Sequence, residues 1–172
     1  GLPFKAYELA QAIGNFSESR RCCEALLPPR EELQAALANG EFRARFQPVV
    51  ELPSLRPTCV ELSVVWERPL SGELYSQRFI SAMVAYELIN ELFTSLLTQG
   101  LDFLAHLPKR HQSLQLSCLV QASQLRDGHF VENLQSHLKR SSISPSRLIL
   151  DLEESALLNL PRHSVAELER LR

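Results

Sequence analysis

Carboxylates stand at two places in apolar surroundings. Glu61 lies inside the run VELSVVW, and Asp151 follows the run RLIL and opens the acidic stretch DLEE, residues 151–154. Carboxylates held close together can bind a cation or transfer a proton. They can also be solvated strand ends, and the DLEE stretch can be an acidic start to a helix, where negative charge is favourable. The residues alone leave both interpretations open.

The thiols and imidazoles add no metal-binding pattern. Cys22 and Cys23 are adjacent, Cys59 and Cys118 are isolated in apolar runs, and no Cys-x-x-Cys or Cys/His spacing exists. The histidines are also unpaired at metal spacing; they are His106, His111, His129, His137 and His163. We therefore expect free thiols in a reducing compartment and mostly solvated histidines.

Composition favours a globular domain and excludes some functions. The 172 residues are 45% hydrophobic and 22% charged, which is ordinary for one folded domain. A net charge of −2, with no Lys/Arg run longer than two, argues against binding to nucleic acid or anionic lipid. No run approaches 18 apolar residues and the N-terminus lacks a signal-peptide layout, so we expect a cytoplasmic protein without a membrane segment.

The order of elements predicts an α/β fold. The first 40 residues are helical in pattern and are expected to lie outside the core, with Pro29 opening the last helix and Gly40 closing it. A long helical region follows at 79–107, with a break expected near Asn90 or Gly100. Further helices are expected at 129–140 and 163–172; strands are expected near 43–51, 58–66, 113–120 and 147–153.

The strands predict an incomplete barrel. Strand and helix alternate at a spacing that favours a parallel sheet, here of about four strands with two unpaired edges. A closed eight-stranded barrel needs about 250 residues. We therefore expect half of such a structure, whose open edges pair with another protein or with a second copy of the chain. Trp66, which closes the run VELSVVW, is expected to pack in the core.

Five segments, in this order, carry a family resemblance: GEFRARFQPVVEL, VELSVVWERPLSGEL, QRFISAMVAYELINEL, SLQLSCLVQASQLRDGHF and SPSRLILDLEESALL. They resemble the first half of an EAL domain, the cyclic di-GMP phosphodiesterase module of bacterial signalling. The resemblance implies the N-terminal half of a modified TIM barrel over residues 30–172. Residues 1–29 are expected to be a helical linker or, since LPFKAYELAQAI is similar to the closing helix of a receiver domain, a remnant of a response regulator.

The resemblance also implies a site at the carboxyl ends of the strands, where relatives bind Mg²⁺ or Mn²⁺ and the dinucleotide. Glu61 matches the ligand glutamate of the E-A-L signature, and Asp151 matches the ligand glutamate of E-I-T-E with one methylene fewer. Leu119 stands where N-L-S supplies a ligand asparagine, and Val65 where relatives carry a ligand-contacting arginine. Gln47 keeps the Q-P residue that contacts guanine.

These changes predict a vestigial site. An arginine contact is worth roughly 1.5 to 3 kcal/mol, so its loss predicts about ten- to a hundredfold weaker cyclic di-GMP binding. The two carboxylates, Glu61 and Asp151, lack the other metal ligands of the family's site. We therefore expect no tight metal site and no cofactor. The family's D-D-F-G-T-G aspartates, catalytic lysine and later glutamate are expected beyond Arg172. We therefore expect an inactive EAL-like regulatory domain that acts by protein contact.

Two alternatives remain open at this stage. The chain could be a fragment of a longer, working cyclic di-GMP phosphodiesterase. It could also be a receptor that binds cyclic di-GMP without hydrolysing it.

Overall fold

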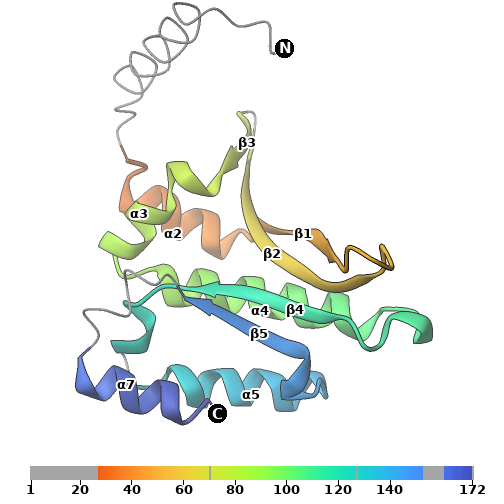
Figure 1. The fold of residues 1–172 in the computed structure, drawn as a ribbon. Coiled ribbons are helices and arrows are strands. Elements are labelled where there is room, and N and C mark those ends of the chain that lie inside the picture. Colours follow the sequence, from red (N-terminus) through yellow and green to blue (C-terminus); the bar gives the residue numbers. More distant parts are fainter. Residues whose placement is uncertain (1–26, 70, 127, 153–160, 172) are drawn as a thin grey trace, which may run out of the picture.

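The computed structural model describes residues 27–69, 71–126, 128–152 and 161–171 (Figure 1). The strands are β1 (Phe42–Val50), β2 (Pro57–Arg68), β3 (Gly72–Tyr75), β4 (Gln115–Val120) and β5 (Leu148–Leu152). The helices are α2 (Arg30–Ala38), α3 (Ile80–Ala85), α4 (Ile89–Ala105), α5 (Phe130–Ser141) and α7 (Arg162–Glu169). Short 3-10 turns are η1 (Ser76–Arg78), η2 (Lys109–His111), η3 (Gln124–Arg126) and η4 (Pro145–Arg147). Cys22, Cys23, Glu153 and Glu154 lie outside the described residues.

The strands form one mixed sheet in the order β1-β2-β4-β5. β2, β4 and β5 run parallel, as predicted, but β1 is antiparallel to β2. The prediction of a wholly parallel sheet was therefore wrong at its first pair. The physical reason is the length of the connection: residues 51–56 suffice for a hairpin, whereas a parallel crossover needs a dozen residues or more.

β3 was not predicted, because residues 67–77 are mostly polar and contain no apolar run. This strand is only four residues long and pairs antiparallel with the end of β2, from Val65↔Tyr75 to Arg68↔Gly72. Gly72 has a φ of +77°, which suits the turn that reverses the chain. β2 continues well past Leu62, its last residue paired with β4, so its far end offers β3 a free edge. β3 therefore forms because it can pair with the end of β2, and apolar periodicity contributes little.

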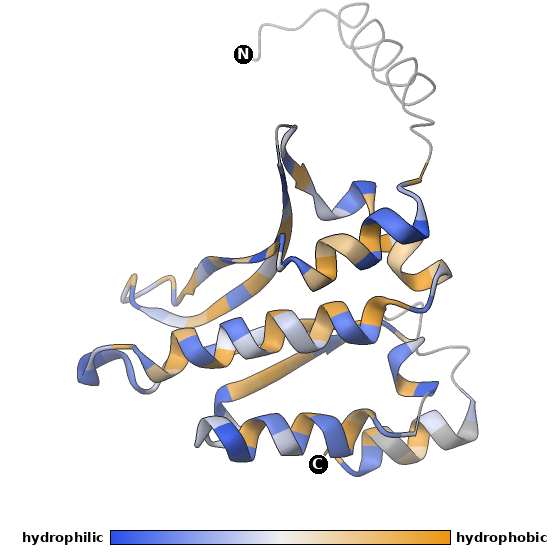
Figure 2. Cartoon of the chain, turned by 180° about the vertical axis from the view of Figure 1, so that it is seen from behind, coloured by the Kyte–Doolittle hydropathy of each residue, from blue (hydrophilic) through white to orange (hydrophobic). Residues whose placement is uncertain are grey.

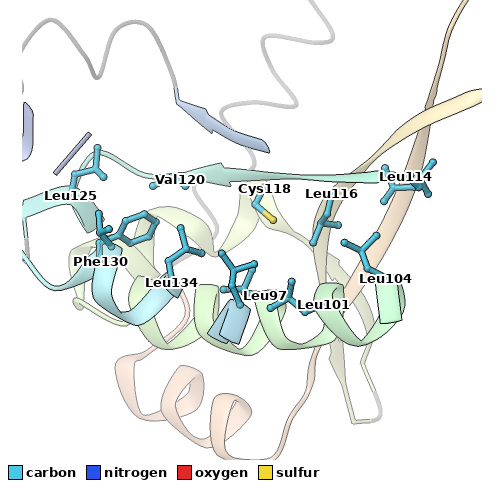
Figure 3. Packing of buried hydrophobic residues seen from close by; sticks show 13 residues of the cluster. Leu97, Leu101, Leu104, Leu114, Leu116, Cys118, Val120, Leu125, Phe130 and Leu134 are labelled. Atoms are coloured by element: carbon cyan, nitrogen blue, oxygen red, sulfur yellow. The ribbon is translucent and has the colours of Figure 1, made fainter. Parts of the chain in front are cut away.

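Helix α4 covers one face of the sheet and joins two parts of the core (Figure 1). Its buried side chains recur at helical spacing, and Figure 2 shows alternating hydrophobic and hydrophilic segments along the helix. Towards its C-terminal end, Leu97, Leu101 and Leu104 face Leu116 and Cys118 of β4 (Figure 3). The apolar side chains that recur along α4 are thus buried against the sheet.

The break in the long helical region lies at residues 86–88, between α3 and α4. There Glu87 adopts a φ of +60°, which no helix interior allows. The break was expected near Asn90 or Gly100; it ends two residues before Asn90, whereas Gly100 is in the middle of α4. A Cβ at Gly100 would lie 2.6 Å from Leu116 Cδ2 and 2.8 Å from Leu62 Cδ1. Glycine therefore lets α4 approach the sheet closely and does not end the helix.

α2 begins after Pro29 and is followed by Gly40 at a φ of +64°, so both predicted helix ends are confirmed. The expectation that this helix lies outside the core was wrong. Leu33 and Ala36 are buried and pack in the second part of the core, with the aromatic residues of β1 and β2. The apolar spacing of these two residues was present in the sequence but is short and weak.

Trp66 is 1% exposed, which confirms its predicted place in the core. Its ring lies 5.3 Å from that of Phe42 and 6.0 Å from that of Phe79, the latter edge-on. Its indole N–H donates to Glu41 Oε2 at 2.9 Å. This hydrogen bond is the main reason why the pKa of the Glu41 carboxyl lies below its usual value.

Gln99 of α4 fills part of the outer edge of β1. Its Nε2 donates to the carbonyl oxygen of Phe42 at 3.0 Å, and its Oε1 accepts from the N–H of Ala44 at 3.0 Å. The side-chain amide thus makes the two bonds that a neighbouring strand would make. It occupies an edge that would otherwise be open to another strand.

Within the described ranges, none of the helices combines the length and the apolar character that crossing a membrane requires.

Candidate functional site

The sheet has one face covered by helices and one open inner face. On β2, Val60, Leu62 and Val64 pack into the core. Because side chains alternate along a strand, Glu61 and Ser63 point to the inner face, where both are exposed. The carboxylate of the VELSVVW run is therefore not buried, although its neighbours are.

Strand pairing gathers four of the residues singled out in the sequence. Gln47 of β1 lies opposite Glu61, and Glu61 lies beside Ser117 of β4. Leu119, the next inner-face residue of β4, lies beside Asp151 of β5. The structure thus brings Gln47, Glu61, Leu119 and Asp151 to one region of the inner face.

Asp151 is engaged by a serine that sequence analysis did not consider. The Ser117 hydroxyl donates to Oδ2 of Asp151, and Ser117 is only 6% exposed. Ser117 lies between Glu61 and Asp151 across the strands. One oxygen of the Asp151 carboxylate is therefore held by the protein itself.

Glu61 and Leu119 line a common pocket of about 440 Å³ between the middle of β2 and the carboxyl end of β4. Leu119 is 50% exposed, so an apolar side chain faces solvent at this site. Ser63 and Gln121 also line the pocket and supply neutral polar atoms. Among the lining residues that the structure describes, Glu61 is the one carboxylate, and none is a lysine, arginine or histidine.

Val65 lies apart from this pocket and is 4% exposed. Its cross-strand neighbour is Arg43, which pairs with Glu67 at 3.5 Å. Arg45 pairs with Glu67 at 3.0 Å and also with Glu73, whose carboxylate raises the pKa of the guanidinium. Both arginines are thus held by carboxylates near the position where relatives of the resembled family carry their arginine.

The donor atoms of the inner face fit a divalent cation poorly. Within the ranges that the structure describes, His, Cys, Asp and Glu side chains form no group of three or more that could hold a metal. Glu61 and Asp151 are the described carboxylates of the region, but Leu119 and Ser117 separate them, and Ser117 already uses one oxygen of Asp151. Mg²⁺ and Mn²⁺ need several oxygen ligands in a compact arrangement.

Cys59 and Cys118 are buried free thiols, as predicted. Burial raises the pKa of the Cys118 thiol to about 12, and the Asp151 carboxylate adds to this effect. Burial also raises the pKa of Cys59. Both groups therefore stay protonated near neutral pH and are poor nucleophiles and poor metal ligands.

Two polar residues of the site, Ser117 and Gln124, were not among the predicted site residues. Ser117 occupies an inner-face position of β4, where Gln115 and Ser117 alternate with apolar residues, and that alternation was the available signal. Gln124 is 1% exposed and also lines the pocket. Its burial depends on packing between segments far apart in the chain, which a single sequence does not reveal.

Comparison with known proteins gives consistent results. The chain is 29% identical over 177 residues to the cyclic di-GMP phosphodiesterase RocR of Pseudomonas aeruginosa; the match covers all of this chain and 45% of RocR. The chain therefore spans less than half the length of that relative. It superimposes on the PaMucR phosphodiesterase in complex with c-di-GMP with a TM-score of 0.76 and 25% identity, covering 82% of this chain and 57% of PaMucR.

A second solved structure shares the fold. The EAL enzyme Bd1971, bound to cAMP and cyclic di-GMP, gives a TM-score of 0.76 at 17% identity and covers 98% of this chain and 49% of Bd1971. These superpositions confirm the predicted partial barrel of the EAL type. The sequence model of the EAL domain matches residues 30–172. By this match, which takes in most of its length, the chain belongs to the EAL domain family.

Proposed function

We propose that this chain is a regulatory domain of the cyclic di-GMP network that does not hydrolyse cyclic di-GMP and acts through contact with another protein. The observation that carries the proposal is Leu119, an exposed leucine that lines the same pocket as Glu61. The resemblance described above assigns a metal-binding asparagine to this position. A leucine side chain has no donor atom for a cation, so this ligand is lost.

Two further features support the proposal. Asp151 has one methylene fewer than the glutamate of its motif, and Ser117 engages one of its oxygens. The shorter side chain moves the carboxylate oxygens away from the metal position. Metal–ligand distances must hold to within a few tenths of an ångström, so the shortened carboxylate no longer reaches the metal. Val65 offers no charge to a ligand phosphate, and Arg43 and Arg45 are held by carboxylates. Binding of both metal and dinucleotide is thus weakened.

The first test is hydrolysis of cyclic di-GMP by the chain as it stands, with Mg²⁺ and with Mn²⁺. The expected result is no turnover above a reaction without protein, with RocR as the positive control. Calorimetry on the same sample is expected to show no binding at about 100 µM ligand. Binding without turnover would identify a receptor, and turnover would contradict the proposal.

A chimera separates a degenerate site from a missing remainder of a longer enzyme. Residues 30–152 of this chain would replace the matching stretch of RocR, and circular dichroism would verify folding. We expect the chimera to be inactive and the triple variant Val65→Arg, Leu119→Asn, Asp151→Glu to recover turnover. If the unmodified chimera hydrolyses cyclic di-GMP within about tenfold of RocR, which is about 1.4 kcal/mol of barrier, the chain is a working half of a phosphodiesterase.

The proposed protein contact includes self-association. Among the described strands, none pairs with the outer edge of β5, and the hairpin between β1 and β2 exposes Val49, Val50, Leu52 and Leu55. Light scattering at micromolar concentration is expected to give the mass of a dimer. A monomeric mass up to about 100 µM would rule out self-association at that strength and leave a different protein as the partner.

A further inference from the structure

The pocket between β2 and β4 has a floor made by helices. β4 pairs with β2 only as far as Leu62↔Cys118, and beyond that point β2 pairs with β3. The two strands separate there, so Ile80 of α3 and Phe93 of α4 reach the pocket from behind the sheet. A volume of about 440 Å³ lies in the range of small-molecule sites.

A ligand in this pocket can reach apolar surface. Leu62, Ile80 and Phe93 line the pocket and are only half-buried, and Leu119 is 50% exposed. The Phe93 ring packs against Phe130, with ring centres 5.4 Å apart, which helps to hold it in place. The apolar body of a ligand would cover these side chains and remove their surface from water, which is favourable.

The carboxylate of Glu61 is exposed at this pocket and has no partner among the described residues. It makes no hydrogen bond and no ion pair with any of them. The other carboxylates of the described strands are all engaged. Glu67 and Glu73 both pair with Arg45. Asp151 accepts a hydrogen bond from a serine hydroxyl. Glu61 is therefore the strand carboxylate that remains available to a ligand.

The charge of the lining selects for a cation. Glu61 carries the only charge among the lining residues that the structure describes, and no basic side chain joins it there. A phosphate or a carboxylate would therefore meet a negative charge and no positive one. An ammonium group would instead pair with Glu61, while an apolar remainder of the same molecule lies against Leu62 and Phe93.

We propose that this pocket binds a small organic ammonium ion, with its apolar body between β2 and α4 and its ammonium group beside the Glu61 carboxylate. Cyclic di-GMP is an anion, so the two ligands carry opposite charge. The inference therefore goes beyond the proposed function and holds whether or not the chain hydrolyses the dinucleotide.

Phenethylammonium and 2-phenylethanol test the proposal as a matched pair, because they share a skeleton and differ in the charged group. Each is titrated into the ¹⁵N-labelled chain in low-salt buffer, and the backbone signals of the pocket residues are followed by NMR. Nine heavy atoms at modest efficiency give millimolar binding, so titration to about 20 mM suffices.

Phenethylammonium is expected to bind about fivefold more tightly than 2-phenylethanol. This preference should fall as NaCl is raised to about 0.5 M, because salt screens the attraction between exposed charges. Methylammonium has the charge but no apolar body, so it is expected to give no saturable shifts over the same range. Saturable binding of methylammonium would show that the charge alone suffices and would overturn the assigned role of the apolar floor.

The variant Glu61→Gln is expected to bring the two affinities to within about twofold, because it removes the charge and keeps the size of the side chain. Glu91→Gln is the matched control. Glu91 is exposed on α4, so the same charge is removed outside the pocket lining and the preference should be unchanged. Equal affinity of the two compounds for the unmodified chain would overturn the proposal without any variant. The absence of saturable shifts at the pocket, or a preference that survives Glu61→Gln, would overturn it as well.

Discussion

Replacing Trp66 by alanine is expected to lower the free energy of unfolding by about 3–5 kcal/mol. The ring is 1% exposed and packs against Phe42 and Phe79, so its loss opens a cavity at the centre of the second core. The variant also loses the hydrogen bond to Glu41 and the contact with the Arg68 guanidinium, 5.0 Å from the ring centre. Urea unfolding followed by circular dichroism measures the effect without relying on tryptophan fluorescence.

One further variant separates the contribution of ring burial from that of the hydrogen bond to Glu41, and a second variant serves as a control. Trp66→Phe keeps most of the aromatic burial and removes the hydrogen bond to Glu41, so its cost should be clearly smaller. The folded pKa of Glu41 lies below its usual value, so the stability from this bond is present above the unfolded pKa and disappears as pH falls through the folded pKa. The difference in the free energy of unfolding between Trp66→Phe and the unmodified chain should therefore become smaller at acidic pH.

Tyr75→Ala is the control, because this ring is 62% exposed. Its loss should lower the free energy of unfolding by less than about 1 kcal/mol. A cost equal to that of Trp66→Ala would refute the assigned core.

Replacing Gln99 by leucine is expected to cost about 1–3 kcal/mol. The leucine fills a similar volume but leaves the Phe42 carbonyl and the Ala44 N–H without the bonds that Gln99 makes. An unpaired edge also invites pairing with another chain, so the variant should aggregate at lower concentration than the unmodified protein. Urea unfolding measures the first effect, and light scattering over a concentration series measures the second.

Gln99→Glu is the informative control, because a carboxylate can still accept from Ala44 but cannot donate to Phe42. Its cost should lie between those of the unmodified chain and Gln99→Leu. Thr98→Ala, at the exposed neighbouring position, should change stability by less than about 0.5 kcal/mol. If Gln99→Leu is as stable as the unmodified chain, the side-chain amide does not stabilise β1.

The sequence predicted the long elements because their apolar residues repeat. β2 and β4 contain apolar runs, and α4 carries an apolar stripe that a helix alone explains. β3 has four residues and no run, and it depends on the free end of β2. β1 is antiparallel because the connection formed by residues 51–56 is short. The sequence contained this signal, but the alternation of strands and helices in the later part of the chain favoured a parallel sheet.

The site was predictable only in part, for a related reason. Motif spacing brought Glu61 and Leu119 into consideration, and strand register then placed them at one pocket. The bond between Ser117 and Asp151 joins positions 34 residues apart, and no local pattern encodes such a pair. Gln124 could not be distinguished from a surface glutamine, because its burial depends on elements that pack around it from elsewhere in the chain.

The antiparallel hairpin of β1 and β2 also sets an order in which this sheet can fold. Its two strands are separated by residues 51–56, so little chain entropy is lost when they meet. The parallel pairing of β2 with β4 closes a loop over residues 63–114, roughly ninefold longer, which costs about 2 kcal/mol more in loop entropy. The hairpin can therefore form first and serve as the template on which α4 and β4 assemble. Substitutions that weaken the hairpin will then slow folding, whereas those in β5 will chiefly speed unfolding.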